Sequence, residues 1–155
     1  MTPLFGHSGR AKRVWTDPVL GVLEYDGKAA WQGRAPFPPL ARDVLLSVVT
    51  AGAEPTGEHR ERFSELGRRY ATMAPAIGQA LLDLYRPARE GHEGNLPDPA
   101  SAEEMRAMTE LDWVEMGADG STRLGYGFRE GAGWDDAMFT LRIVNWEPIP
   151  EHLDD

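Results

Sequence analysis

The alternation of apolar and polar residues in the first third of the chain predicts β-strands. Residues 20–25 and 28–32 flank Asp26-Gly27, a dipeptide that suits the positive φ angles of a tight hairpin turn. Asp17-Pro18 marks a break before this hairpin, because proline donates no backbone hydrogen bond and restricts the residue that precedes it. We therefore expect a β-hairpin, preceded by a separate short strand at residues 12–16.

Further strands are expected on both sides of the chain centre. The run RDVLLSVVTA, residues 42–51, is apolar at both alternating sets of positions, a pattern typical of a strand covered on two faces. In the last third, alternation returns at residues 112–116, 122–129 and 137–145, with a turn at Asp119-Gly120. The chain thus carries six to seven segments that are typical of strands.

The central part of the chain has the periodicity of a helix. Apolar side chains between residues 57 and 85 recur at steps of three and four: Phe63, Leu66, Tyr70, Met73, Ile77, Leu81 and Leu84. Pro75 removes a helical hydrogen bond without breaking this apolar phase, so we expect one kinked helix or two abutting helices, ending before Pro87. Ser101 and Glu104 form a capping-box pattern, which predicts a short second helix through about Met108.

The order of strands, helices and strands indicates an α+β fold in a single domain spanning residues 1–155. We expect a mostly antiparallel sheet of six to seven strands, with the kinked central helix and the short second helix packed on one face. Residues 88–100, rich in glycine, proline and polar side chains, are predicted to form a flexible loop. Residues 1–11 and the acidic tail 147–155 are predicted to be loose termini.

Composition and charge narrow the class of protein. The chain of 155 residues suits one domain, and no apolar run approaches the roughly 20 residues that cross a bilayer. No apolar segment follows the basic residues at the start, so we expect a cytoplasmic protein. A formal net charge of −9 repels nucleic-acid backbones and favours a basic partner. The absence of cysteine excludes disulfides, thiolate metal sites and cysteine nucleophiles.

The stretch LGYGFREGAGWDD, residues 124–136, carries closely spaced glycines and raises the question of a phosphate-binding loop. Such a loop joins a strand to a helix, whereas this stretch leads into another strand and lacks the Gly-Lys-Ser/Thr ending. We interpret Gly125 and Gly127 as strand residues that let a helix or a large aromatic side chain approach one face of the sheet. Gly131 and Gly133 are assigned to the loop that follows.

The residues that could perform catalysis or hold a metal ion are scattered. Asp135 and Asp136 lack the alternate spacing of a calcium loop, and no two of the four histidines have the i, i+4 spacing of a zinc-binding helix. No serine lies in the G-x-S-x-G elbow of a hydrolase. The sequence therefore predicts no metal, no cofactor and no enzymatic activity.

Aromatic and acidic residues near the ends of strands are the candidates for binding a partner. Five tryptophans are a high number, and Trp134 and Trp146 lie where an indole ring could be exposed as an interface anchor. Asp135 and Asp136 follow Trp134 directly and would add negative charge. We therefore predict that these four residues bind a basic partner protein.

Two other functions are compatible with the sequence. A groove between sheet and helix, lined by Glu24, Trp31, Glu115 and Tyr126, could bind a small molecule or support hydrolysis through a carboxylate of raised pKa. Alternatively, an exposed strand edge could pair with a second copy of the chain in a structural homo-oligomer. The three hypotheses differ in the ligand that each requires: a basic protein, a small molecule or a second copy of this chain.

Several segments resemble those of a group of bacterial domains. The segments W-T-D, L-G-V-L-E-Y-D, W-Q-G, D-V-L-L-S-V-V, D-W-V-E-M and D-D-A-M-F-T-L-R-I lie within about residues 14–145. They are similar to an uncharacterised bacterial family found with polymorphic toxin and contact-dependent inhibition systems. The resemblance implies a role as an immunity protein and brings no catalytic residues. It also implies an architectural role for the hairpin positions that carry it, namely Gly21, Tyr25, Asp26, Trp31 and Gly33.

Overall fold

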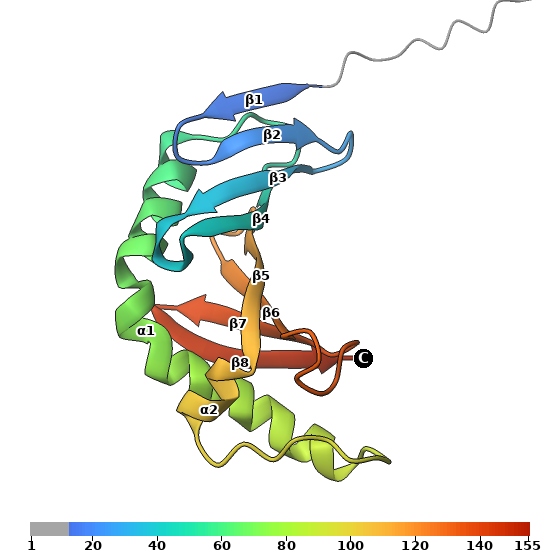
Figure 1. The fold of residues 1–155 in the computed structure, drawn as a ribbon. Helices are drawn as coiled ribbons and strands as arrows, with labels where there is room; N and C mark the ends of the chain where they lie inside the picture. The colour runs from blue at the N-terminus through green and yellow to red at the C-terminus, as the bar shows by residue number, and fades with distance from the viewer. Residues whose placement is uncertain (1–12) are drawn as a thin grey trace, which may run out of the picture.

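The strands of the described chain form one sheet in which every strand lies beside its neighbours in sequence (Figure 1). The structure is a computed structural model that describes residues 13–155, so the predicted loose segment 1–11 lies outside it. The strands are β1 (Val14–Asp17), β2 (Gly21–Tyr25), β3 (Ala30–Phe37), β4 (Arg42–Val49), β5 (Thr109–Met116), β6 (Thr122–Phe128), β7 (Met138–Val144) and β8 (Glu147–Asp154). The predicted α+β class is confirmed, but the sheet has eight strands rather than six to seven.

The additional strand is the tail that the sequence predicted to be loose. Residues 147–154 pair antiparallel with β7, with Pro148 opposite Ile143 and Pro150 opposite Leu141. Two prolines suggested an unpaired tail, because proline cannot donate a backbone hydrogen bond. An edge strand tolerates proline, since one side of its backbone has no strand to pair with.

The sheet is antiparallel throughout except between β4 and β5, which run parallel. A parallel neighbour requires a crossover connection, and this one contains both helices of the described chain. They are α1 (Gly57–Glu90), of 34 residues, and α2 (Ala102–Ala107). A 3₁₀ turn, η1 (Pro38–Leu40), joins β3 to β4. The predicted mostly antiparallel sheet, with one long helix and one short helix, is therefore confirmed.

The central helix is continuous and longer than predicted. It passes through Pro75 and bends along its length beside the sheet (Figure 1). The predicted end before Pro87 is wrong, because the helix continues to Glu90. Pro87 lacks only the hydrogen bond that its own nitrogen would donate, and its carbonyl still accepts one from Gly91 N (3.3 Å). Residues 88–90 of the predicted flexible loop thus belong to the helix.

The rest of that loop is attached to the end of α1. The carbonyl of Pro97 accepts hydrogen bonds from the Tyr85 hydroxyl (2.5 Å) and from Arg89 Nε (3.0 Å). The predicted capping box at the far end of the loop is confirmed in part. Glu104 N donates a hydrogen bond to Ser101 Oγ (3.1 Å), and α2 begins at Ala102, directly after Ser101. The mobility of residues 91–100 stays a prediction.

The turn between β2 and β3 is wider than the predicted two-residue turn. β2 ends at Tyr25 and β3 begins at Ala30, so residues 26–29 connect them. The Asp26 carboxylate accepts hydrogen bonds from the backbone nitrogens of Lys28 (2.8 Å), Ala29 (2.9 Å) and Ala30 (3.1 Å). These bonds stabilise the wider turn in place of the predicted one.

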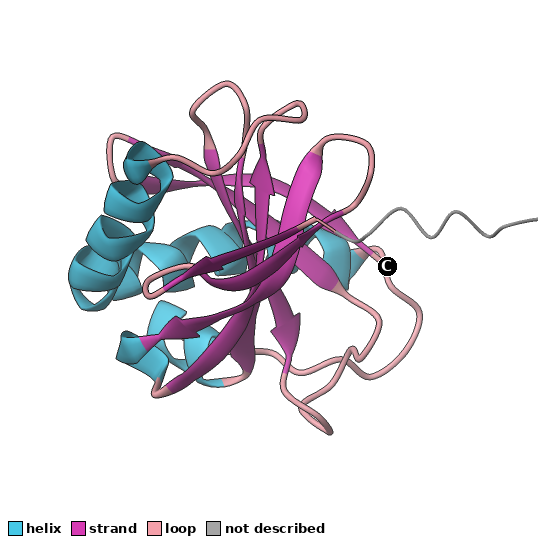
Figure 2. Cartoon of the chain, turned by 90° about the horizontal axis from the view of Figure 1, so that it is seen from above, coloured by secondary structure: helices cyan, strands magenta, loops and turns pink. Residues whose placement is uncertain are grey.

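The hydrophobic core lies between α1 and one face of the sheet. Figure 2 shows the helices and the strands of the sheet from above. The largest fully buried side chains of this core are Trp31, Tyr85, Tyr126, Phe37 and Phe139. The prediction that β4 is covered on both faces is wrong: Val44, Leu46 and Val48 are buried, whereas Leu45 is 47% exposed. The second face of the sheet therefore has no helix over it in residues 13–155, and we refer to it as the open face.

Candidate functional site

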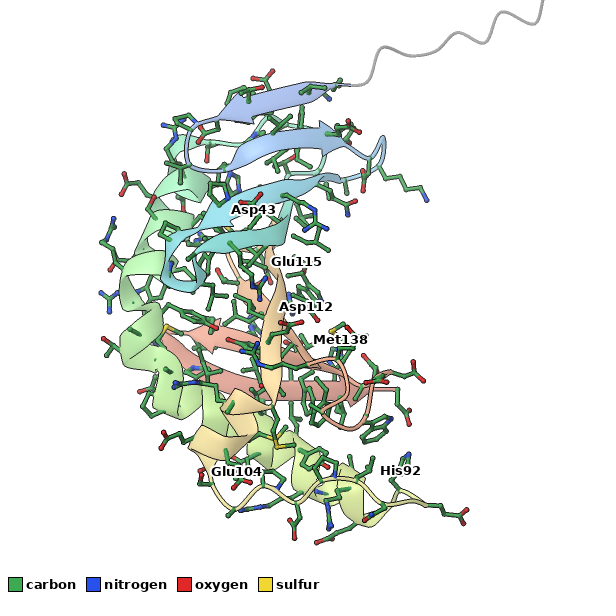
Figure 3. All side chains as sticks on the ribbon, in the orientation of Figure 1. Asp43, His92, Glu104, Asp112, Glu115 and Met138 are labelled. Carbon is green, nitrogen blue, oxygen red and sulfur yellow. The ribbon has the colours of Figure 1, made fainter. Side chains whose placement is uncertain are left out.

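The open face carries two adjacent rows of side chains that run across β2 to β8. Residues paired across strands share a face, so the registers define both rows. The first row is Val22, Arg34, Leu45, Trp113, Gly125, Thr140 and His152. The second is Glu24, Gln32, Ser47, Glu115, Arg123, Arg142 and Ile149. Asp112, Glu115 and Met138 extend on the side away from α1 (Figure 3).

A hollow of about 310 Å³ lies at the centre of this face, over the parallel junction of β4 and β5. The side chains of Leu45 and Trp113 form its apolar part. Gln32, Ser47 and Glu115 border it with polar groups. The hollow thus combines an apolar centre that includes a tryptophan with a polar border.

Trp113 is held in place by a glycine on the neighbouring strand. A methyl group at position 125 would lie 1.9 Å from Cε2 of Trp113, so the indole ring occupies the space that a side chain at Gly125 would need. At Gly127 the corresponding space holds the Asp112 carboxylate, at 2.7 Å. The prediction that a glycine here admits a large aromatic side chain is therefore confirmed, and Gly125 is the glycine that makes room for Trp113 on the open face.

Replacing Gly125 with alanine is expected to lower the free energy of unfolding by about 1–3 kcal/mol, because the new methyl group displaces the Trp113 ring. Urea denaturation would measure the loss. Adding Trp113→Ala removes the clash, so the effect of Gly125→Ala should be much smaller in that background. Gly57→Ala is the control, since a methyl group there meets no atom within 4 Å. Equal losses from Gly125→Ala in both backgrounds would contradict the assigned contact.

Glu115 lines the central hollow, and other charged side chains of the open face lie near it, including Arg34 opposite Leu45. Glu24 on β2, Asp43 on β4 and Asp112 and Glu115 on β5 lie on or beside the open face. Burial raises the pKa of the Asp112 carboxyl, the charge of Glu110 raises it further, and Arg42 opposes both effects. Towards β8 the charges are paired, with Arg123 3.7 Å from Glu115 and 3.0 Å from Glu151.

The structure does not bring together the four residues of the predicted sheet–helix groove. Glu24 and Glu115 lie in one row of the open face. Trp31 and Tyr126 are buried on the opposite face, each 1% exposed. Because neighbouring positions along a strand point to opposite faces, the two carboxylates and the two aromatic rings cannot line one groove.

The predicted partner-binding residues lie at opposite ends of β7. Trp134 is in the β6–β7 loop, where its ring is 4.6 Å from that of His92, and Asp135 and Asp136 beside it are exposed. Trp146 is in the β7–β8 turn, where the Arg69 guanidinium lies 4.9 Å from the ring. Both rings are partly buried against the core. The four residues therefore do not form one patch, and binding of a partner by any of them stays a prediction.

Two residues of the central hollow were not among the sequence candidates. The sequence signal for Leu45 was the run at residues 42–51, which is apolar at both alternating sets of positions. Because the sheet is covered on only one face, one of these sets must expose apolar side chains, and Leu45 belongs to it. For Trp113 the signal was the alternation with Val114 and Met116, which are buried on the other face. Its position beside Leu45 depends on the parallel pairing of β4 with β5, which the sequence does not show.

Within residues 13–155, no group of three or more histidine, aspartate or glutamate side chains is placed to hold a metal ion. No helix in this part of the chain has both the length and the apolar character needed to cross a lipid bilayer. Comparisons of the chain with known protein families, with curated proteins and with solved structures found no match. The resemblance to immunity proteins therefore stays a prediction.

Proposed function

We propose that this chain is a protein-binding domain that takes a basic protein partner on the open face of its sheet. The observation that carries the proposal is the central hollow, where Leu45 is 47% exposed and lies beside Trp113. An apolar anchor of the partner would occupy this hollow and displace water from it. A few well-packed residues at the centre of an interface, often including a tryptophan, typically supply most of its binding energy.

The charge of the open face supports a basic partner rather than an acidic one. Glu115 lines the hollow, Asp43 and Asp112 lie on the same two strands, β4 and β5, and the whole chain has a formal net charge of −9. Arg34, opposite Leu45, is a basic residue beside the hollow. Complementary charge speeds encounter and disfavours wrong partners, while the apolar centre sets how long the complex lasts. The expected partner surface is therefore an apolar residue flanked by lysine or arginine.

This proposal is compatible with the role that the resemblance implies. An immunity protein acts by covering its toxin, and many such targets would be basic if they act on nucleic acids. We extend the proposal to a cytoplasmic inhibitor without catalytic activity of its own. A homo-oligomer formed through strand edges is less favoured, since β1 has only four residues and β8 carries Pro148 and Pro150.

The proposal is tested by affinity capture from the lysate of the native cell at low and high salt. Wild type is expected to retain one basic protein at low salt and to release part of it at high salt. Leu45→Arg places a positive charge in the hollow and should abolish retention. Gln79→Arg adds the same charge on the exposed surface of α1 and should retain the protein as wild type does.

Capture of the same protein by wild type and by Leu45→Arg would contradict the proposed face. Circular dichroism of each variant would show that the fold is intact. Leu45 is suitable for this test because its side chain is not part of the core.

A further inference from the structure

A second hollow lies where the parallel strands separate. β4 and β5 pair only from Leu45 opposite Trp113 to Val48 opposite Met116, so their first residues diverge. The hollow between them has a volume of about 600 Å³ and is bounded by α1, α2 and the two strands. Arg42 spans the gap, with its Nη2 donating a hydrogen bond to the Leu111 carbonyl (2.6 Å). This hollow shares no residue with the hollow on the open face.

Three arginines line this second hollow. Arg129 is partly neutralised, because its Nη1 lies 3.7 Å from Glu110 Oε2, and its Nε donates to the Ala107 carbonyl (3.0 Å). Arg42 and Arg106 have no carboxylate within 4.0 Å among residues 13–155. The hollow therefore has an excess of positive charge in a chain whose formal net charge is −9.

A pair of tyrosine hydroxyl groups adds a hydrogen-bond donor. The hydroxyl oxygens of Tyr70 and Tyr126 are 2.6 Å apart. One of the two hydrogens makes this bond, and the other remains free to donate to a ligand. Burial raises the pKa of both tyrosines, and Arg42 and Arg106 lie close enough to oppose that rise. Both hydroxyls consequently stay protonated at neutral pH.

The rest of the wall is mixed, because Thr109 and Glu110 of β5 are polar and the remaining residues are apolar. Pro39 and Leu40 of η1 and Ala71 and Ala74 of α1 face the hollow and offer no charged group. The hollow of about 600 Å³ is much larger than an inorganic phosphate or sulfate ion requires. A fitting ligand would thus combine a doubly charged group with a small apolar body.

We propose that this hollow binds a small phosphate monoester, with the phosphate group against Arg42 and Arg106 and the apolar body against Pro39, Leu40 and the α1 alanines. A phosphate dianion matches the charge of two arginines that have no carboxylate partner among residues 13–155, and a planar guanidinium group such as that of Arg106 donates two parallel hydrogen bonds to it. Arg42 donates to the Asp43 and Leu111 carbonyls and contributes mainly its charge. The free tyrosine hydrogen donates to a third oxygen. This binding is independent of the protein partner proposed for the open face.

Isothermal titration calorimetry at constant ionic strength tests the proposal, with phenyl phosphate and inorganic phosphate as probes. Phenyl phosphate is expected to bind wild type more tightly than inorganic phosphate does, because only the ester fills the apolar part of the hollow. Arg106→Gln should weaken phenyl phosphate binding at least ten-fold. Arg86→Gln removes the same charge from an exposed site on α1 outside the hollow and should leave the affinity unchanged.

Tyr70→Phe is a second variant, and it should weaken phenyl phosphate binding several-fold by removing the hydroxyl pair. If titration of wild type with phenyl phosphate produces no heat of binding, the proposal is overturned. Equal affinities of wild type, Arg106→Gln and Arg86→Gln would also overturn it, because binding would then be a general effect of charge. None of these results depends on whether the open face binds a protein.

Discussion

Truncation of Trp31 to alanine is expected to lower the free energy of unfolding by about 4 kcal/mol, and the melting temperature by on the order of 10 °C. The ring is 1% exposed, packs 5.3 Å from the Tyr25 ring, and pairs across the sheet with Val48. Its Nε1 also donates a hydrogen bond to the Ala53 carbonyl (2.7 Å), which connects β3 to the segment before α1. Removal leaves a large cavity and breaks that connection.

Urea denaturation of wild type, Trp31→Ala and Trp31→Phe would measure this effect. Phenylalanine keeps most of the apolar volume but cannot donate to Ala53, so its expected loss is smaller, about 1–2 kcal/mol. If Trp31→Ala does not fold, the phenylalanine variant still tests the packing. A loss below about 1 kcal/mol from Trp31→Ala would contradict the burial of this ring in the core.

Replacing Asp17 with asparagine is expected to cost about 2–3 kcal/mol. The Asp17 side chain is 2% exposed and accepts hydrogen bonds from Val19 N (2.8 Å) and Leu20 N (3.0 Å). Its second oxygen accepts from Arg60 Nε (2.8 Å) on α1. One carboxylate thus stabilises the turn after β1 and ties it to the helix, and the neutral amide can satisfy only part of this set.

The pH dependence of stability provides a second measurement on the same pair of proteins. The hydrogen bond from Arg60 holds the pKa of Asp17 below its ordinary value, while burial opposes this shift. A lowered pKa in the folded state means that the stabilisation is present above about pH 4 and is lost as pH falls through the lowered pKa. The difference between wild type and Asp17→Asn should therefore be constant near neutral pH and shrink in acid.

The exposed Asp43 provides the control, since Asp43→Asn should change the free energy of unfolding by less than about 0.5 kcal/mol. Equal losses from Asp43→Asn and Asp17→Asn would show that general charge, rather than the buried contact with Arg60, determines the effect.

Local patterns predicted most elements of the fold. The three-and-four spacing of apolar residues correctly predicted α1, and the Ser101–Glu104 pattern correctly predicted the start of α2. Both patterns depend on contacts between residues that are close in the sequence. The exceptions were positions where a neighbour in space decided the outcome. Pro148 and Pro150 looked like the end of ordered structure, but β7 was available to pair with them. Pro87 looked like the end of a helix, but only one hydrogen bond was lost there.

The candidate sites were less predictable than the fold, because they depend on register. Trp113 lies beside Leu45 because β5 pairs in parallel with β4, and no local pattern fixes that pairing. Arg42 and Arg106 are 64 positions apart in the sequence and meet only where β4 and β5 separate. Tyr126 did belong to a hollow between sheet and helix, as the sequence suggested, but its neighbours there are arginines rather than the predicted carboxylates.

The most direct test of binding at the open face is an NMR titration of wild type with the captured basic protein. Signals from the Leu45 methyl groups and the Trp113 indole are expected to shift most, because both side chains lie at the central hollow. The indole signals of Trp134 and Trp146 should change little. Large shifts at Trp134 or Trp146, with Leu45 and Trp113 unchanged, would contradict the proposed face and place the partner on the loops at the ends of β7.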